Sequence, residues 1–170
     1  GCPVMSSGTQ SRPRILIVED DQTLSDQLSG LLTSKGYQVQ QCFEGDQALL
    51  DALSLRLDLI LLDVLLPRMN GFDVLERLRK TRQTPVMMLT ACGAEEERIL
   101  GYQQGADDYL PKPFNPLELT VRIQAVLKMA WRCWISTLKP SPIRTSLSSI
   151  KRCLCLLLTG MLVSLTAHAQ

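Results

Sequence analysis

The sequence predicts an α/β fold, a doubly wound five-stranded parallel sheet with five helices. Two observations carry this prediction. Five short apolar runs alternate with five segments of helical periodicity, which is the order of successive β–α units. The runs are apolar throughout instead of at every second residue, as in strands that are buried on both faces. We expect the strand order 2-1-3-4-5, with ligands at the carboxyl ends of the strands.

The first two β–α units contain the first two strands and helices. Leucines at helical spacing predict the first helix, which ends before Gly36, and the second helix begins behind Gly45. The predicted elements are a strand at 14–18 (RILIV), a helix at 22–35, a strand at 37–42 and a helix at 46–53.

The other three units follow the same alternation. Their strands include a second long apolar run and the run PVMML, and the last strand is very short. The predicted elements are strands at 57–62, 85–89 and 108–110, and helices at 72–79, 95–104 and from Pro116 to about Met129. We therefore expect one domain over 14–130, with a disordered leader over 1–13.

Charge divides the chain into two unequal parts. Residues 1–118 hold 17 acidic and 11 basic residues, a net charge of −6, whereas the remaining 52 residues hold seven basic residues and no acid. The only histidine, His168, lies near the end, which excludes a histidine dyad or a zinc–histidine site in the main domain. The six cysteines form no C-x-x-C pair and no secretion signal precedes the first strand, so we expect a reduced, cytoplasmic setting.

Charged and polar residues gather where the predicted strands end. The first strand runs into Glu19, Asp20 and Asp21, and the third ends at Asp63. The fourth strand ends at Thr90, and the fifth leads into Lys112. Because these four strands are neighbours in the predicted sheet, their ends bring several carboxylates, a hydroxyl and an ammonium group into one shallow site.

Such a site needs a cation. Two carboxylates about 4 Å apart repel by roughly 4 kcal/mol at an effective dielectric constant of about 20, and one lysine cannot balance three of them. An all-oxygen site with few ligands suits Mg²⁺. A carboxylate can itself be a nucleophile and form an aspartyl phosphate, and phosphoryl transfer requires mainly positioning and charge neutralisation.

Each of these residues also has a purely structural interpretation. Glu19-Asp20-Asp21 could cap a helix, Thr90 could be a hydroxyl at a strand end, and Lys112 could be a solvated charge. Their joint occurrence at four neighbouring strand ends favours the phosphoacceptor site.

Residues 14–130 resemble the receiver domain of bacterial two-component response regulators, which has a flavodoxin-like fold. The motifs that carry the resemblance are ILIVEDD, LILLDVLLPRMNGFDVL, PVMMLTA and GADDYLPKPF, in the family's order and spacing. The last motif resembles the winged-helix transcription-factor subfamily (OmpR/PhoB type) in particular.

The resemblance implies that Asp63 accepts a phosphoryl group from a sensor histidine kinase. It implies that Mg²⁺ is held by Asp20, Asp63 and the carbonyl group of Leu65, with Glu19 nearby or acting through water. It further implies that the chain is no stand-alone enzyme but takes part in phosphoryl transfer to its own Asp63 and in slow autodephosphorylation.

The resemblance also implies a switch that reports phosphorylation. Thr90 and Lys112 would contact the phosphoryl group, and Thr90 with Tyr109 would form the switch pair. The signal would reach the face made by the fourth helix, the fifth strand and the fifth helix. The Lys112–Pro113 peptide bond would be cis.

In this subfamily the same face forms a symmetric homodimer. Ion pairs between Arg98 and Glu118 and between Asp108 and Arg122 would cross the two-fold axis. A third pair usual in the family falls on two uncharged glutamines. Surface ion pairs contribute only about 0–1 kcal/mol each, so they set the register of a dimer more than its affinity.

Residues 131–170 do not match the winged-helix domain that the subfamily would place there. They contain five basic and no acidic residues, and no helix-turn-helix pattern. The run Cys153–Ala167 would span about 22 Å as a helix, short of a bilayer core of about 30 Å, so a membrane is not expected as a partner. We expect a tail that is not a folded domain, and no sequence-specific DNA binding by this chain; DNA would be a partner only with a winged-helix domain present.

Three origins of this tail stay open. Our preferred hypothesis is a reading-frame shift near residues 128–132, because acidic residues stop and Trp, Cys and Ser appear abruptly. A membrane-associating tail and a disordered tail of other origin are the alternatives.

Two alternative functions follow from the same residues. A small-molecule phosphatase with a nucleophilic aspartate would need a general acid two residues after Asp63, where this chain has Leu65. A stand-alone receiver that acts by binding a partner protein requires no output domain, and it remains the alternative to a transcription regulator.

Overall fold

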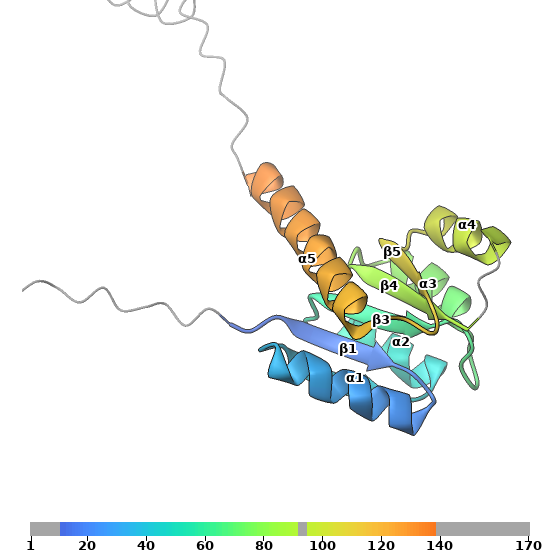
Figure 1. Cartoon of the computed structure of the whole chain (residues 1–170). Coiled ribbons are helices and arrows are strands. Elements are labelled where there is room, and N and C mark those ends of the chain that lie inside the picture. Colours follow the sequence, from blue (N-terminus) through green and yellow to red (C-terminus); the bar gives the residue numbers. More distant parts are fainter. Residues whose placement is uncertain (1–10, 92–94, 139–170) are drawn as a thin grey trace, which may run out of the picture. The chain divides into compact units, whose positions relative to one another are not determined.

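The computed structural model describes residues 11–91 and 95–138, and it confirms the predicted fold class. The sheet is parallel, with the strand order β2-β1-β3-β4-β5 (Figure 1). The strands are β1 (Arg14–Val18), β2 (Gln38–Cys42), β3 (Leu59–Asp63), β4 (Val86–Thr90) and β5 (Asp108–Pro111). The helices are α1 (Gln22–Ser34), α2 (Gly45–Ser54), α3 (Gly71–Arg79), α4 (Glu95–Gln103) and α5 (Pro116–Leu138).

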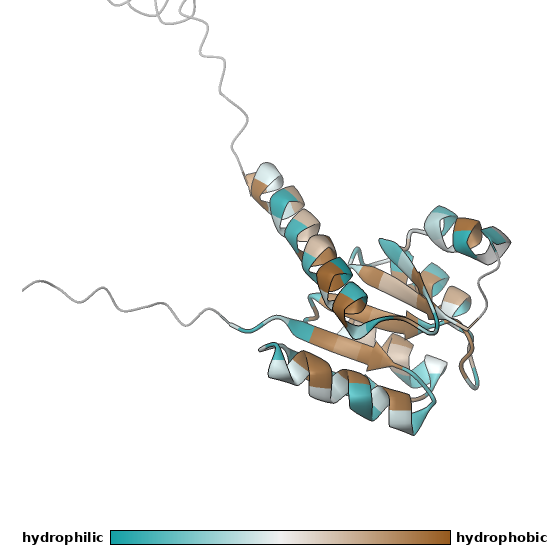
Figure 2. Cartoon of the chain, viewed as in Figure 1, coloured by the Kyte–Doolittle hydropathy of each residue, from teal (hydrophilic) through white to brown (hydrophobic). Residues whose placement is uncertain are grey.

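Two buried clusters hold the helices against the sheet, one on each face. On one face, Leu28 of α1 and Ile123 of α5 pack with strand residues such as Ile17. On the other face of the sheet, Ala48 of α2 and Leu75 of α3 pack with the strand residues whose side chains point to that face. Successive side chains of a strand point to opposite faces, so strands covered on both sides are apolar at every position, and Figure 2 shows the central strands in brown.

The register of the sheet aligns the carboxyl ends of the central strands. Val18 at the end of β1 is paired with Leu62, and Asp63 at the end of β3 is paired with Leu89. Thr90 at the end of β4 is paired with Pro111 of β5. The residues that follow these positions therefore emerge at one edge of the sheet.

Two predicted boundaries differ from the structure by two residues or more. Strand β3 begins at Leu59 instead of residue 57, because the backbone N–H of Arg14 donates to the side-chain carboxylate of Asp58. The backbone N–H of Asp58 in turn donates to the carbonyl group of Arg14. Helix α5 continues nine residues past Met129 to Leu138. Nothing between those residues breaks a helix, and Pro140 disfavours helical backbone at the residue before it.

Most of the predicted leader and most of the predicted tail lie outside the described residues. One compact unit ends at Cys133, and of the second unit, Trp134–Gln170, the structure describes only 134–138, the last residues of α5. The predicted boundary at residue 130 therefore falls inside a helix, and the state of residues 139–170 stays a prediction. Within 11–91 and 95–138, no helix is both long and apolar enough to cross a bilayer.

Gly71, the first residue of α3, is required by the turn that follows β3. A Cβ atom at Gly71 would lie 2.2 Å from the carbonyl oxygen of Asp63 and 3.0 Å from the Cα atom of Val64, both backbone atoms. We expect Gly71→Ala to lower the free energy of unfolding by about 2–3 kcal/mol, because relief requires the chain at Asp63 to move. The measurement is urea denaturation.

Gly30 provides the matched control for this substitution. It lies within α1, is exposed, and has no atom within 4 Å of the position of its Cβ. Gly30→Ala is expected to raise the unfolding free energy by about 0.5–1 kcal/mol, the usual preference for alanine in a helix. Equal effects of the two changes would contradict the steric argument.

Candidate functional site

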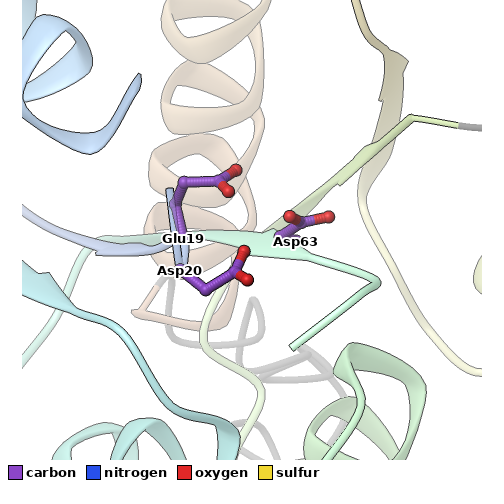
Figure 3. Close-up of side chains that lie close together, drawn as sticks. All are labelled: Glu19, Asp20 and Asp63. Carbon is purple, nitrogen blue, oxygen red and sulfur yellow. The ribbon is translucent and has the colours of Figure 1, made fainter. Parts of the chain in front are cut away.

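Three carboxylates meet at the carboxyl edge of the sheet. Glu19 and Asp20 follow β1, and Asp63 is the last residue of β3. One carboxylate oxygen from each lies within 4.8 Å of the others, and Figure 3 shows the three groups around the same space. Glu19 and Asp63 are buried, whereas Asp20 is exposed, so the cluster opens to solvent on the side of Asp20.

The third acid after β1 has a different role. The carboxylate of Asp21 accepts a hydrogen bond from the backbone N–H of Leu24 and is the N-cap of α1. The structural interpretation of the Glu19-Asp20-Asp21 run is thus correct for Asp21.

Lys112 bridges two of the clustered carboxylates. Its ammonium group lies 2.5 Å from Oε2 of Glu19 and 3.0 Å from Oδ2 of Asp63. The backbone N–H of Lys112 donates to the carbonyl of Thr90 at 2.6 Å, and the Lys112–Pro113 bond is cis, as predicted. The hydrogen bond to Thr90 holds the backbone of Lys112 at the end of β5, next to β4.

Burial sets the electrostatics of this group. Loss of solvent raises the pKa of Glu19 to about 7; the hydrogen bond from Lys112 opposes the rise and the charge of Asp63 adds to it. Burial lowers the pKa of Lys112, but the bonds to Glu19 and Asp63 together raise it above its ordinary value. The lysine therefore stays charged, and one ammonium group faces three carboxylates.

The loop after β3 shapes the other side of Asp63. The backbone N–H of Leu65 donates to Oδ1 of Asp63 at 3.2 Å, and the N–H of Gly71 closes the turn onto the carbonyl of Val64 at 2.8 Å. The side chain of Asn70 caps α3 by accepting from the N–H of Asp73. Each oxygen of Asp63 thus has one donor, which orients the carboxylate.

The donor set fits a small hard cation. Two oxygens bound to one Mg²⁺ at about 2.1 Å lie at most about 4.2 Å apart, so small movements of the clustered oxygens suffice. Asp20 and Asp63 are the better placed ligands. Both oxygens of Glu19 already accept hydrogen bonds, one from Lys112 and one from the backbone N–H of Asp21.

The structure places both predicted switch residues in the interior. Thr90 is buried at the end of β4, on the strand next to that of Asp63, and Tyr109 is buried on β5. A Cβ atom at Gly101 of α4 would lie 3.1 Å from the ring of Tyr109, so this ring packs directly under α4. A movement of the Tyr109 ring toward α4 would therefore require α4 to move.

The four residues predicted to form a dimer interface all have partners within the chain. Asp108 accepts from Arg122 at 3.0 Å, and Arg122 also pairs with Glu118 at 3.0 Å. Arg98 lies 3.8 Å from Glu95, one turn earlier on α4. Within one chain Asp108 thus pairs with Arg122, and Arg98 pairs with Glu95; the pairs between two chains stay a prediction.

Two contacts in the structure were not predicted from the sequence. The hydroxyl of Tyr102 on α4 lies 3.2 Å from Oδ1 of Asp108 and links α4 to β5. Arg68, in the loop after β3, has a left-handed backbone with φ 68° and pairs with Glu44 at 3.1 Å. A positively charged residue directly after a proline in a turn was the available signal for Arg68; nothing in the sequence singles out Tyr102.

Comparison with known proteins agrees with this geometry. Residues 15–124 match the response regulator receiver domain family. The chain is 53% identical over 115 residues to the transcriptional regulatory protein CpxR of Escherichia coli K12, covering 68% of this chain and 49% of CpxR. It is 46% identical over 116 residues to the transcriptional activator protein PfeR of Pseudomonas aeruginosa, covering 68% of this chain and 38% of PfeR. The chain thus spans about half the length of CpxR and less of PfeR.

Solved structures show the same fold. The receiver domain of Francisella response regulator 1452 matches with a TM-score of 0.68 and 32% identity, over 70% of this chain and 99% of that one. A CheY-like receiver domain from Methanospirillum hungatei matches with a TM-score of 0.69 and 32% identity, over 72% of this chain and 98% of that one. The chain therefore belongs to the response regulator receiver domain family of two-component signalling systems.

Proposed function

We propose that this chain is a phosphoacceptor that receives a phosphoryl group on Asp63 from a sensor histidine kinase in the presence of Mg²⁺. The observation that carries the proposal is the meeting of Asp20, Asp63 and Lys112 at one edge of the sheet, with Asp63 held by a donor on each oxygen. A charged carboxylate in that position is a nucleophile that needs only a cation and a positioned donor.

In this mechanism each residue has a separate task. A carboxylate oxygen of Asp63 forms the new bond to phosphorus as the bond from phosphorus to the donor's histidine nitrogen breaks. Lys112 and the Thr90 hydroxyl bind the oxygens of the transferred group. Asp20 and Asp63, with the Leu65 carbonyl, would hold Mg²⁺, which when bound neutralises phosphoryl charge. Hydrolysis of the aspartyl phosphate would reset the protein slowly.

The direct test is the metal dependence of phosphorylation. The protein is incubated with a small acyl-phosphate donor, with Mg²⁺ or with a chelator, and its intact mass is recorded over time. We expect the addition of one phosphoryl group with Mg²⁺ and at least a hundredfold slower addition with the chelator, since removing the cation removes several kcal/mol of charge stabilisation. Equal rates would overturn the assignment of the metal.

Mg²⁺ is also expected to stabilise the folded protein through Asp20. A ligand present at a hundred times its dissociation constant adds about 2.7 kcal/mol to the free energy of unfolding. Asp20→Asn should remove this increment without destabilising the metal-free protein, because Asp20 is exposed and its charge repels Asp63. Urea denaturation with and without Mg²⁺ measures both quantities.

Asp21→Asn is the matched control for the metal site. Asp21 adjoins Asp20 but caps α1 and is not one of the clustered carboxylates. This variant should lose at most about 1 kcal/mol of stability, as weakened caps do, and keep the full response to Mg²⁺. An Asp20→Asn variant that still responds to Mg²⁺ would show that the ion binds elsewhere.

We propose that phosphorylation drives pairing of two chains through α4, β5 and α5. The support is that Tyr109 packs under α4 and that Asp108, Arg122 and Glu118 form a charged strip on β5 and α5. A phosphoryl group would need about 5.5 kcal/mol of differential binding to reverse a 1:99 equilibrium.

Reversing one charge on this face is expected to weaken the dimer. Arg98→Glu should raise the dimer dissociation constant of the phosphorylated protein about tenfold, because two symmetric pairs of up to about 1 kcal/mol each are lost. Arg77→Glu, on an exposed position of α3, is the control and should leave the constant unchanged. Sedimentation analysis measures the dissociation constants of both variants. Equal effects of the two substitutions on this constant would place the interface elsewhere.

The names of the relatives support a proposal for the output of the signal. CpxR and PfeR are named as transcription regulators, and we propose a cytoplasmic role in transcription for a complete family member. For the described residues alone, the supported role is that of a receiver that acts through a second copy or a partner protein.

A further inference from the structure

The loop between β3 and α3 is fastened to the start of α2, a contact that the proposed mechanism does not use. This loop, residues 64–70, contains Leu65, whose carbonyl group is a proposed ligand of Mg²⁺. The side chain of Arg68 lies 3.1 Å from the carboxylate of Glu44 and 3.9 Å from that of Asp46. The two acids flank Gly45, the first residue of α2. One arginine of the loop thus contacts the residues on both sides of the point where α2 begins.

The backbone of Gly45 lies close against the same loop. Its N–H donates to the carbonyl oxygen of Pro67 at 3.3 Å. A Cβ atom at this position would lie 1.9 Å from the carbonyl oxygen of Met69 and 2.8 Å from its carbonyl carbon, both backbone atoms. A residue other than glycine would therefore require the loop or the start of α2 to move.

The backbone of Arg68 is held in an unfavourable conformation. Its φ of 68° lies in the left-handed region, which residues with a Cβ atom seldom adopt. Such backbone persists where the surrounding structure holds it, and it is frequent at functional sites. The side chain of Arg68 is 64% exposed, so its ion pairs contribute little to stability by themselves. The place in which the arginine holds the loop explains this arrangement better than stability does.

We propose that Arg68 and Gly45 are positioning residues for Mg²⁺. They hold the loop so that the carbonyl group of Leu65 reaches the ion that Asp63 binds. The hydrogen bond from the N–H of Leu65 to Oδ1 of Asp63 fixes the chain before this carbonyl group, and the contacts with α2 fix it afterwards. We call these contacts with α2 the loop clamp. The inference rests on the proposed function, from which it takes the ion and its ligands.

The loop clamp acts on the affinity for the ion. An apparent dissociation constant equals the intrinsic constant divided by the fraction of molecules in the binding-competent conformation. A loop released from α2 adopts several conformations, so this fraction falls and the apparent constant rises. A direct effect of charge has the opposite sign, because a nearby arginine repels a cation and its removal would tighten binding. The direction of the change therefore distinguishes a clamp from a simple charge effect.

The test is a titration of the whole protein with Mg²⁺. Urea denaturation at a series of Mg²⁺ concentrations gives both the metal-free unfolding free energy and the dissociation constant of the ion. Arg68→Asn removes the ion pairs, and asparagine tolerates left-handed backbone better than arginine does. We expect the dissociation constant to rise about fivefold, equivalent to about 1 kcal/mol, the upper range for surface ion pairs.

The matched control for this variant is Arg77→Asn. Arg77 is an exposed arginine in the last turn of α3, at the far end of that helix from the loop. Its substitution removes the same charge without touching the loop clamp. It should change the dissociation constant of Mg²⁺ by less than about twofold, as expected for a screened surface charge.

Two further changes test the two parts of the loop clamp. Arg68→Glu should raise the dissociation constant at least about fivefold, and adding Glu44→Arg should return it to within about twofold of wild type, because the pair forms again with the net charge of wild type. Gly45→Ala should raise the constant at least about tenfold, since its Cβ atom displaces the loop. Gly30→Ala, the same change with no atom within 4 Å, should not alter it. Thermal melts verify that each variant folds.

Three results would overturn the inference. A dissociation constant that falls in Arg68→Asn would show that the arginine acts through its charge. A loss of metal-free stability with an unchanged constant would give the loop clamp a purely structural role; the metal site would still stand if Asp20→Asn loses the response to Mg²⁺. A wild-type protein that does not respond to Mg²⁺ would overturn the metal site and the loop clamp together.

Discussion

Asp63→Ala is expected to abolish phosphoryl uptake completely. The wild-type protein, incubated with Mg²⁺ and a small acyl-phosphate donor, should gain the mass of one phosphoryl group, and the variant should gain none. The reason is that Asp63 is the carboxylate at the edge of the sheet with an oriented side chain, held by Lys112 at 3.0 Å and by the N–H of Leu65 at 3.2 Å. Intact-mass spectrometry over a time course makes the measurement.

The control must exclude a folding defect. Asp63→Ala leaves Lys112 paired with Glu19 and removes one of three mutually repelling carboxylates, so its metal-free stability should match or exceed that of the wild type. Asp73→Ala removes an exposed carboxylate of α3 and should be phosphorylated at the wild-type rate. Equal phosphorylation of Asp63→Ala and wild type would end the assignment of Asp63 as the acceptor.

Lys112→Met is expected to lower the free energy of unfolding by about 3 kcal/mol in the absence of metal. The substitution leaves Glu19 and Asp63, which are 1% and 4% exposed, without the ammonium group between them. Breaking a buried ion pair costs about 3–5 kcal/mol. The smaller of these costs applies here for two reasons. The lysine side chain is 18% exposed, and Glu19, whose pKa is about 7, can take up a proton.

Mg²⁺ should restore part of this loss, because a divalent cation at Asp20 and Asp63 supplies the missing positive charge. Urea denaturation of Lys112→Met with and without Mg²⁺ is the measurement. Lys80→Met, at the exposed C-cap of α3, is the control and should change stability by less than about 0.5 kcal/mol. A loss below 1 kcal/mol for Lys112→Met would mean that the lysine does not neutralise the cluster.

Local patterns of the sequence predict most of the fold. Continuous apolar runs mark strands covered on both faces, and the alternation with helices determines a parallel sheet. Once the strand order is set, the carboxyl ends of β1, β3, β4 and β5 must meet, so the grouping of Asp20, Asp63, Thr90 and Lys112 follows from topology. The end of α5 was harder to place, because nothing near Met129 in the sequence stops a helix.

Side-chain contacts between elements were decided only by the tertiary structure. The sequence put Glu19 near the metal site, but 93 residues separate it from Lys112, and the pairing depends on how close the ends of β1 and β5 come. The bond from Tyr102 to Asp108 likewise depends on how α4 lies against β5. Local sequence determines which residues reach the edge of the sheet; which atoms touch there depends on packing between elements far apart in the chain.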